Sequence, residues 1–353
     1  MSRAQLTSTV EQNSAGAASP FVAGKNKFIN GDFNINQRNA TSVTTNDTCA
    51  FDRWKLSLGT GGGSATYSAQ TFTPGTAPVT GYESANYSQI VTASQSAAGD
   101  FAGIFQRIED VRTLANQTAT ISFWAKAASG TPSVAITLEQ NFSTGGSATV
   151  PTPLGNVQLS TSWKRYSITA TVPSISGKTI GNANANLTVF LFTSIGSTLT
   201  SAGYGTLGLQ NATISFWGMQ LEAGSVATPF TTASGTLQGE LALCQRYYWR
   251  STATEVYSTY GNGQAETTNQ ANILVQFPTP MRVQPTSTDW SNLALYHSGA
   301  TITPVTNITA AHGSQYNYWL NAVTAAGALT LYRPAIMIAN NTASSYVGFS
   351  AEL

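Results

Sequence analysis

The segment Ala119-Thr120-Ile121-Ser122-Phe123-Trp124 occurs a second time, letter for letter, as Ala212-Thr213-Ile214-Ser215-Phe216-Trp217. Both copies are rich in β-branched and aromatic residues, a composition that is typical of β-strands. The repeat therefore predicts two similar strands inside one all-β unit. Convergence of two unrelated positions on a good core strand is the alternative interpretation.

Short strands and turn signals surround both copies. Apolar and polar residues alternate between Val134 and Leu138, and again between Arg165 and Val172. Clusters of Gly, Pro, Ser and Asn, such as residues 59–64, separate these runs. Many short strands with regular turn signals favour a β-sandwich, and a jelly roll is the natural closure of its two sheets. We expect an all-β fold class with a jelly-roll domain over residues 25–233.

A short connecting helix is predicted over residues 234–250. Four residues fall on one stripe at helical spacing: Leu237, Leu241, Cys244 and Tyr248. Ser234 or Thr236 is placed to cap its start. The helix would be either a connector that packs on the sandwich or a short trimer-forming element between two domains.

The regions at the two ends of the chain differ in composition and in hydrophobic pattern. After Arg250 strand-like runs return, at residues 273–277, 293–296, 316–320, 329–332, 335–338 and 347–351. These runs predict a second small β-sandwich domain over residues 251–353. Residues 1–24 are small and polar, which indicates an extended arm or a segment that docks on a partner.

Composition narrows the class of protein. Charged residues make up 9% of the chain, with 16 Lys and Arg against 15 Asp and Glu. Because nucleic-acid binding needs a basic footprint, we expect no nucleic-acid partner. The sequence shows no signal-type N-terminus and no apolar run of about 18 residues, so neither export by a signal peptide nor membrane insertion is expected. The two cysteines, Cys49 and Cys244, predict buried thiols instead of a disulfide framework.

Seven short sequence motifs occur in a characteristic order along the chain. They are KFINGDFNINQR at 27–38, FDRW at 51–54, ISFWAK at 121–126, WKRY at 163–166, QLEAG at 220–224, ELALCQRYY at 240–248 and FPTPMR at 277–282. Together they resemble the carbohydrate-binding-module-like jelly-roll domain of tailed-bacteriophage fibre and tail proteins, with the helix and distal domain that often follow it. The resemblance covers residues 25–353.

The resemblance implies a place on the virion surface for a protein that is made in the host cytoplasm. It implies a homotrimer that attaches to other virion proteins, of the tail or the capsid, through residues 1–24. Such modules often hold a structural calcium ion between their first and last strands, where this chain offers Asp32 and Glu222. A turn aspartate and a surface glutamate are the alternative interpretation of that pair. No other cofactor is expected.

A host-surface glycan is the expected ligand, because sugars stack on Trp or Tyr rings while amides bind their hydroxyl groups. Residues 251–353 supply the candidates: Trp290, Tyr296, Tyr316, Asn317, Tyr318 and Trp319. On a strand, Tyr316 and Tyr318 would share one face and Trp319 would lie on the other. A buried position for Trp290, and a subunit contact for the whole cluster, are the alternatives.

No catalytic site is expected. The only histidines, His297 and His312, have no Ser or Asp partner at useful spacing, and His312 before Gly313 indicates a turn. A hydrolytic fibre needs paired carboxylates in a cleft, whereas the adjacent Glu109 and Asp110 would point to opposite strand faces. The sequence thus favours a fibre or appendage that contacts glycans during adsorption. A structural head-decoration or vertex fibre is the first alternative, and a polysaccharide depolymerase is the second.

Overall fold

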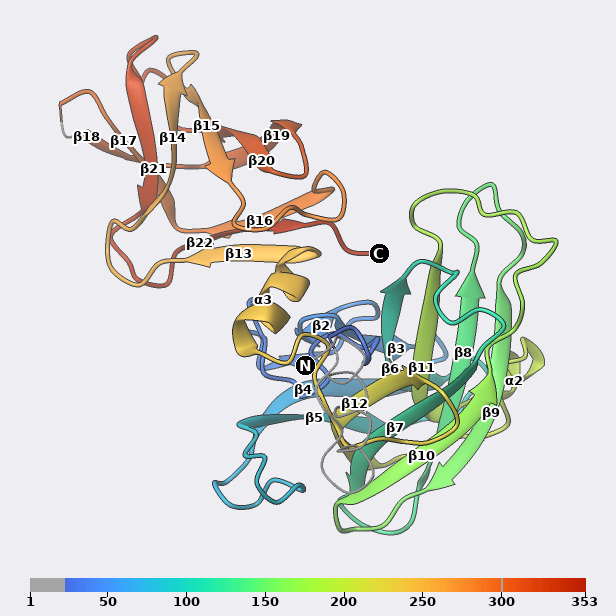
Figure 1. Ribbon diagram of the computed structural model, residues 1–353. Helices are drawn as coiled ribbons and strands as arrows, with labels where there is room; N and C mark the ends of the chain where they lie inside the picture. Colours follow the sequence, from blue (N-terminus) through green and yellow to red (C-terminus); the bar gives the residue numbers. More distant parts are fainter. Residues whose placement is uncertain (1–22, 300) are drawn as a thin grey trace, which may run out of the picture. The chain divides into compact units, whose positions relative to one another are not determined.

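The computed structural model describes residues 23–299 and 301–353, and the fold is all-β with two short helices among these residues (Figure 1). The chain divides into unit 1, residues 1–240 with Leu353, and unit 2, residues 241–352. Residues 1–22 of the predicted N-terminal arm lie outside the described part of the chain. Neither described helix is long and apolar enough to cross a membrane.

Unit 1 is a jelly-roll β-sandwich of two antiparallel sheets. Sheet A contains, in spatial order, β1 (Ser42–Val43), β4 (Ser64–Thr71), β5 (Asn86–Ala93), β12 (Thr213–Ala223), β7 (Thr118–Ala127) and β10 (Lys164–Thr171). Sheet B contains β2 (Cys49–Phe51), β3 (Trp54–Leu58), β6 (Phe101–Glu109), β11 (Asn186–Ile195), β8 (Ser133–Asn141) and β9 (Val150–Gln158). The helix α2 (Ser197–Ser201) follows β11.

The two copies of the repeated segment are neighbouring strands. The first copy lies in β7 and the second in β12, and the strands pair antiparallel with Trp124 opposite Trp217. In both copies the Ile and Phe residues point into the sandwich, where Phe123 and Phe216 are fully buried. The prediction of two similar strands in one unit is therefore confirmed.

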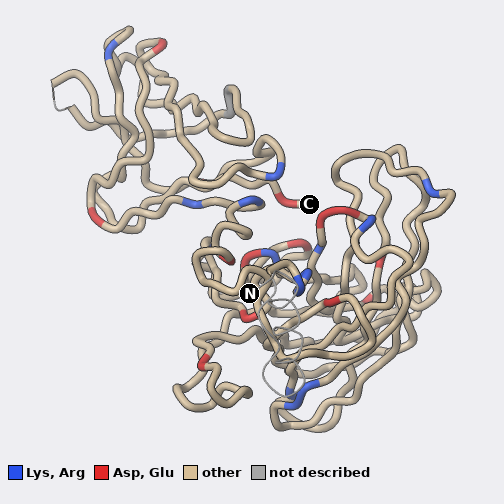
Figure 2. The backbone as a smooth tube through the Cα atoms, viewed as in Figure 1, with Lys and Arg blue, Asp and Glu red and all other residues tan. Residues whose placement is uncertain are grey.

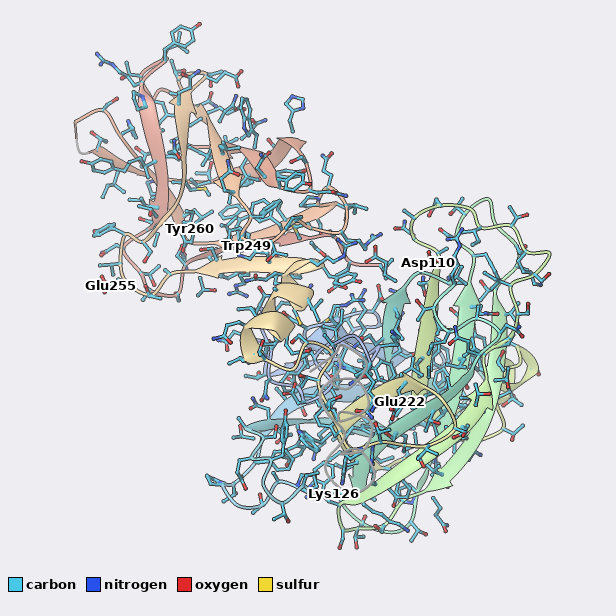
Figure 3. All side chains as sticks on the ribbon, in the orientation of Figure 1. Asp110, Lys126, Glu222, Trp249, Glu255 and Tyr260 are labelled. Atoms are coloured by element: carbon cyan, nitrogen blue, oxygen red, sulfur yellow. The ribbon has the colours of Figure 1, made fainter. Side chains whose placement is uncertain are left out.

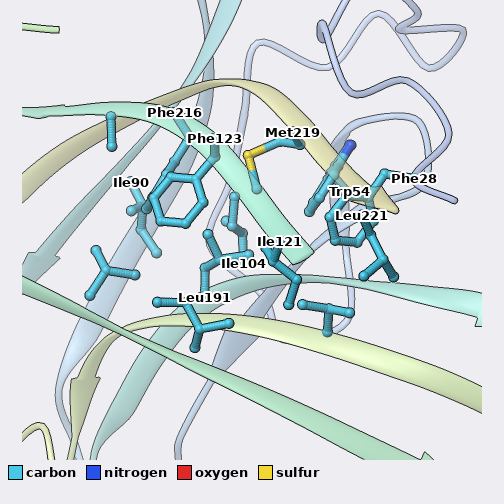
Figure 4. Packing of buried hydrophobic residues seen from close by; sticks show 14 of the residues in the cluster. Phe28, Trp54, Ile90, Ile104, Ile121, Phe123, Leu191, Phe216, Met219 and Leu221 are labelled. Carbon is cyan, nitrogen blue, oxygen red and sulfur yellow. The ribbon is translucent and has the colours of Figure 1, made fainter. Parts of the chain in front are cut away.

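The core of unit 1 forms where the inner faces of its sheets meet. Phe123, Phe216 and Ile90 come from sheet A, and Ile104 and Leu191 from sheet B (Figure 4). Strand alternation places these apolar side chains on one face of each strand. Burial of this apolar surface is the main favourable contribution to the stability of the sandwich.

A β-bulge interrupts β12 directly after the repeated segment. The register between β12 and β7 shifts between Trp217 and Gln220, and Gly218 has a φ of 63°. A Cβ atom at Gly218 would lie 2.6 Å from Cε3 of Trp124, so only glycine fits at this place. The bulge also returns Met219 and Leu221 to the core.

Residues 224–236, called the strap below, pack on aromatic side chains of sheet A. The Phe230 ring centroid lies 5.1 Å from that of Trp217 and 6.3 Å from that of Trp124. The guanidinium of Arg165 donates to the Thr228 carbonyl oxygen and lies over the Trp124 ring, 4.7 Å from its centroid. These contacts help to leave Trp217 without exposed surface.

Unit 2 contains two further antiparallel sheets. Sheet C consists of β13 (Tyr248–Thr252), β22 (Tyr346–Ser350) and β16 (Ser287–Ser291). Sheet D consists, in spatial order, of β18 (Thr301–Pro304), β17 (Leu293–His297), β21 (Pro334–Ala339), β14 (Thr259–Ala265), β15 (Gln270–Gln276), β20 (Asn317–Val323) and β19 (Asn307–Gly313). The predicted strand at 329–332 is wrong, because these residues form bends and turns.

The core of unit 2 joins aromatic side chains from both sheets. Phe349 of β22 packs against Trp249 of β13, with ring centroids 5.8 Å apart, and against Tyr318 of β20, at 5.6 Å. Trp249 and Tyr260, which Figure 3 labels, are partly buried against this core. One face of sheet D is thus covered by packing within the unit.

The helix α3 (Leu237–Gln245) is shorter than the helix predicted over 234–250. The Thr236 hydroxyl accepts a hydrogen bond from the Gly239 N–H at 3.1 Å, which makes Thr236 the N-cap. Tyr248 belongs instead to β13, where it pairs with Ser350. Cys49 and Cys244 are buried and form no disulfide, as predicted.

Candidate functional site

One row of side chains crosses all seven strands of sheet D on the face turned away from the core of unit 2. The strand register places its members opposite one another in this order: His312, Trp319, Leu274, Asn262, Ile336, Tyr296 and Ile302. We call this set the apolar row. It is assembled from strands far apart in sequence, since β14 (Thr259–Ala265) lies beside β21 (Pro334–Ala339).

The apolar row exposes large hydrophobic side chains to solvent. Trp319 is 45% exposed, Tyr296 40%, Ile302 39% and Ile336 36%. The neighbours of Trp319 on β20 show why, because Tyr318 and Leu320 point into the core and leave Trp319 on the other face. Exposed apolar groups that gather in one place mark an interaction surface more often than single ones do.

Polar side chains that can both donate and accept hydrogen bonds flank the apolar row. Two positions further along the strands, the register aligns Thr309, Asn321, Asn272 and Gln264, a set that we call the amide row. On the other side of the apolar row, Asn317 lies opposite Gln276. The Oδ1 atom of Asn272 is buried and has no hydrogen-bond partner within the protein. The face therefore combines rings with amide donors and acceptors.

Sheet D carries no Lys, Arg, Asp or Glu in any of its seven strands. Figure 2 shows the same feature, since the charged positions of unit 2 lie on sheet C and in the connecting segments. A ligand on the apolar row would thus meet no Lys, Arg, Asp or Glu side chain of sheet D. The absence of Asp and Glu also leaves this face without the paired carboxylates that glycoside hydrolysis needs.

Two of the six predicted glycan-contact residues lie in the apolar row, namely Trp319 and Tyr296. Asn317 faces the same side of β20, and the exposed Tyr316 lies in the turn before that strand. Tyr318 is a core residue, only 5% exposed, which removes it from the candidate contact set.

Trp290 lies elsewhere in unit 2. It belongs to β16 of sheet C, opposite Val347, and packs partly buried against the unit core. The alternative interpretation, a buried position, therefore describes Trp290 better than a glycan contact does. His312, interpreted from the sequence as a turn residue, lies in β19 opposite Trp319, which corrects that interpretation.

The sequence patterns missed most of the apolar row and the amide row. The sequence predicts strands that contain Leu274 and Ile336, and none at Ile302, and it indicates no surface role for these residues. Hydrophobic alternation along β21 and β15 was the available signal, but it does not tell which strands are neighbours. The alignment of Trp319 with Tyr296 depends on the strand order of sheet D, which the sequence does not state.

The predicted calcium ligands lie in separate hydrogen-bond networks of unit 1 (Figure 3 labels Glu222). The carboxylate of Glu222 accepts hydrogen bonds from Gln220 and from the N–H and hydroxyl of Thr228, and Lys25 lies 3.5 Å away. Such partners are donors and a cation, which do not fit a calcium ligand. Within the described residues, no group of three or more His, Cys, Asp or Glu side chains could hold a metal ion.

Asp32 has a different environment. One carboxylate oxygen accepts hydrogen bonds from Asn34 at 2.7 Å and from the Tyr82 hydroxyl at 3.2 Å, whereas Oδ1 has no hydrogen-bond partner. Burial raises the pKa of Asp32, and the neighbouring charge of Glu240 raises it further. The acidic neighbour of Asp32 is thus Glu240, a residue that the sequence did not connect with it.

A second buried carboxyl group lies on sheet B. The Tyr204 hydroxyl donates to the Glu139 carboxylate, and burial raises the pKa of Glu139 while the charge of Arg107 lowers it. Tyr204 and Arg107 stabilise the Glu139 carboxylate, so we interpret this group as structural.

No family model matches the chain, and no curated protein matches it. Among solved structures it is similar to the enzymatically active domain of tailspike protein 4 from bacteriophage CBA120, with 15% identity and a TM-score of 0.35. That match covers 57% of this chain and 22% of the tailspike chain, so this chain spans less than a quarter of the tailspike chain.

Carbohydrate-binding modules are also similar to this chain. The CBM22-2 xylan-binding domain of Paenibacillus barcinonensis Xyn10C has 17% identity and a TM-score of 0.32, over 52% of this chain and 98% of that domain. A family 11 module from Clostridium thermocellum has 11% identity and a TM-score of 0.31, over 53% and 98%. At these TM-scores the similarities do not assign a function to the chain.

Proposed function

We propose that this chain is a non-enzymatic, glycan-binding appendage protein of a phage virion, and that the apolar row of sheet D contacts the host-surface glycan during adsorption. The observation that carries the proposal is the alignment of Trp319, Tyr296 and two exposed isoleucines on one face of unit 2. A surface of this kind provides stacking area, and the amide row provides hydroxyl contacts beside it.

The chemistry of sugars fits such a face. A pyranose ring has an apolar side that packs on an aromatic ring and a rim of hydroxyl groups that donate and accept hydrogen bonds. Asn321 and Gln264 each offer both kinds of group two positions from the apolar row. The face therefore meets both requirements, and it does so without using any residue of the core.

The proposed location on the virion is based on the resemblance of the sequence motifs to phage fibre and tail proteins. We propose that residues 1–24 attach the protein to tail or capsid proteins, that the protein forms a homotrimer, and that it lies on the virion surface. A structural calcium ion at Asp32 and Glu222 is not part of this proposal, because the partners of Glu222 do not fit that role.

A subunit contact is the second candidate function for the apolar row. It is favoured by Ile302 and Ile336, because exposed aliphatic side chains are common where subunits meet. In that case the protein would be a structural decoration or vertex fibre without a receptor site. A depolymerase is not proposed, since sheet D lacks acidic residues.

The test is adsorption of the labelled full-length chain to host cells, compared with the double variant Trp319→Ala/Tyr296→Ala. We expect the double variant to bind at least about tenfold more weakly, because both stacking surfaces are lost. Tyr257→Asn is the matched control, since Tyr257 is similarly exposed at 43% but lies outside sheet D. Asn tolerates the positive φ of 62° at that position.

Adsorption of the double variant at the level of the unaltered chain would contradict the proposal. Sedimentation velocity of the same samples separates the second candidate function. If the double variant loses a trimer that the Tyr257→Asn variant keeps, the apolar row is a subunit interface.

A further inference from the structure

We propose that the apolar row binds an uncharged, linear glycan that lies across the strands of sheet D, with Trp319 and Tyr296 as two separate stacking platforms. This inference rests on the proposed function and adds the chemical class, the direction and the minimum length of the ligand. It is carried by the strand register, by the exposure of both rings and by the charge of the sheet.

The absence of charge selects the class of glycan. An acidic sugar on this face would give up water around its carboxylate or sulfate without meeting a Lys or Arg of sheet D. Burial of a charge without a partner is costly, whereas neutral hydroxyl groups are satisfied by amides. The face therefore matches a neutral polysaccharide and disfavours an anionic one.

The strand order gives the direction of the bound chain. Trp319 lies on β20 and Tyr296 on β17, and β15, β14 and β21 separate these two strands. Four steps of about 4.8 Å place the two platforms about 19 Å apart along the register. One sugar ring cannot reach both, so a ligand that uses both rings must be an oligosaccharide that crosses the strands.

The positions between the platforms support a continuous chain. Leu274 and Ile336 provide apolar contacts, and Asn262 between them is an exposed amide. The amide row runs parallel at about 7 Å, the spacing of two residues along a strand. Asn321 and Gln264 of this row offer side-chain amides beside the apolar row.

Two measurable properties follow from this arrangement. Affinity should rise with glycan length until both rings are engaged, because the second contact is then intramolecular. Binding should also change little with ionic strength, because screening acts on charges and sheet D carries no fixed charged side chain. Anionic ligands that bind by charge would behave in the opposite way.

The probes for the test come from the host itself. Cell-surface polysaccharide is separated on an anion-exchange resin into an unretained neutral pool and a retained acidic pool. Partial hydrolysis of each pool then gives a ladder of fragment lengths. Binding of the full-length chain is measured by titration at about 0.05 M and about 0.5 M NaCl. Trp319→Ala, Tyr296→Ala and the control Tyr257→Asn are measured beside it.

We expect binding to the neutral pool, equal at both salt concentrations and tighter for long fragments. Each single variant should lose at least about tenfold in affinity for long fragments, and its affinity should no longer rise with length. Binding to the acidic pool that falls with salt, or a length dependence that survives both single variants, would overturn the inference while leaving glycan binding intact.

Binding to neither pool would overturn the proposed function together with the inference. A change of sedimentation coefficient in Trp319→Ala and Tyr296→Ala, with no change in Tyr257→Asn, would show that a second copy of the chain occupies the face. That result would also overturn the inference.

Discussion

Two pairs of aromatic residues, one pair in each unit, differ in their exposure to solvent. In unit 1, Trp54 and Trp217 have no exposed surface, and each packs against at least two other rings. In unit 2, Trp319 and Tyr296 keep close to half of their surface exposed on sheet D. Rings in unit 1 are therefore used to stabilise the fold, whereas these rings in unit 2 remain available to a partner.

The strap shows how unit 1 reaches its arrangement. Phe230 packs on Trp217, and Arg165 holds the Thr228 carbonyl oxygen, so that aromatic side chains of sheet A are packed by residues of the same unit. The difference teaches that exposure of rings in unit 2 is not a general property of this sequence. The exposed rings lie on one face of sheet D and at turn residues of unit 2 such as Tyr257 and Tyr316.

The largest expected effect is the loss of a buried ring in unit 1. Trp54→Ala should lower the free energy of unfolding of unit 1 by about 3–5 kcal/mol, because it leaves a cavity beside Phe28 and Phe33. The indole N–H also donates to the Asn30 carbonyl oxygen at 3.0 Å. Trp319→Ala, by contrast, should cost less than about 1 kcal/mol. Denaturant unfolding of both variants checks this; similar losses would remove the contrast between the units.

A somewhat smaller effect is expected from Glu240, whose buried carboxylate joins two backbone segments of unit 1. It accepts hydrogen bonds from the Asn30 N–H at 2.8 Å and the Ser234 N–H at 2.6 Å. Glu240→Ala should destabilise unit 1 by about 2–3 kcal/mol, because both N–H groups lose a charged acceptor. Glu240→Gln keeps an acceptor and should cost less. Calorimetry measures both, and equal transition temperatures for the unaltered chain and Glu240→Ala would contradict the prediction.

Asp32 gives unit 1 a pH dependence that comes from a carboxyl group, and the strands of sheet D contain no carboxyl group. Because burial raises the pKa of Asp32 in the folded state, its contribution to stability is fully present below the ordinary pKa of 3.8. That contribution is lost as the pH rises through the raised folded pKa. The stability of Asp32→Asn relative to the unaltered chain should therefore increase with pH across this window.

Unfolding measured at several pH values above 3.8 tests this sign. A stability difference between the two proteins that stays constant with pH would show that Asp32 keeps its ordinary pKa. A difference that falls as the pH rises would show that the pKa is lowered instead.

The smallest expected effect concerns metal removal. The Glu222 carboxylate already accepts hydrogen bonds from Thr228 and forms an ion pair with Lys25. Because these partners occupy the carboxylate, treatment with a chelator should leave the unfolding temperature of unit 1 unchanged. Added calcium should likewise have no effect. A fall in unfolding temperature on chelation that calcium restores would support the predicted calcium site at Asp32 and Glu222 after all.

The sequence predicted the elements of the fold better than their boundaries. The repeated segment identified β7 and β12 because strand composition and alternation are local properties. The helix was predicted too long. Leu237 and Tyr248 have the spacing of residues on one helix face, but Tyr248 pairs in β13 and Leu237 faces solvent. Backbone pairing at a distance overrode the local pattern there.

By itself, the sequence determined that this is an all-β protein with few charges and that Trp319 and Tyr318 face opposite sides of a strand. The period of the hydrophobic pattern and the amino-acid composition are local properties, so they can be determined without knowing which segments are in contact. Only the tertiary structure decided that Tyr318 is the buried one and that Trp319 shares a row with Tyr296. Strand order and register arise from contacts between segments far apart in sequence, and those contacts decide which side chains meet water.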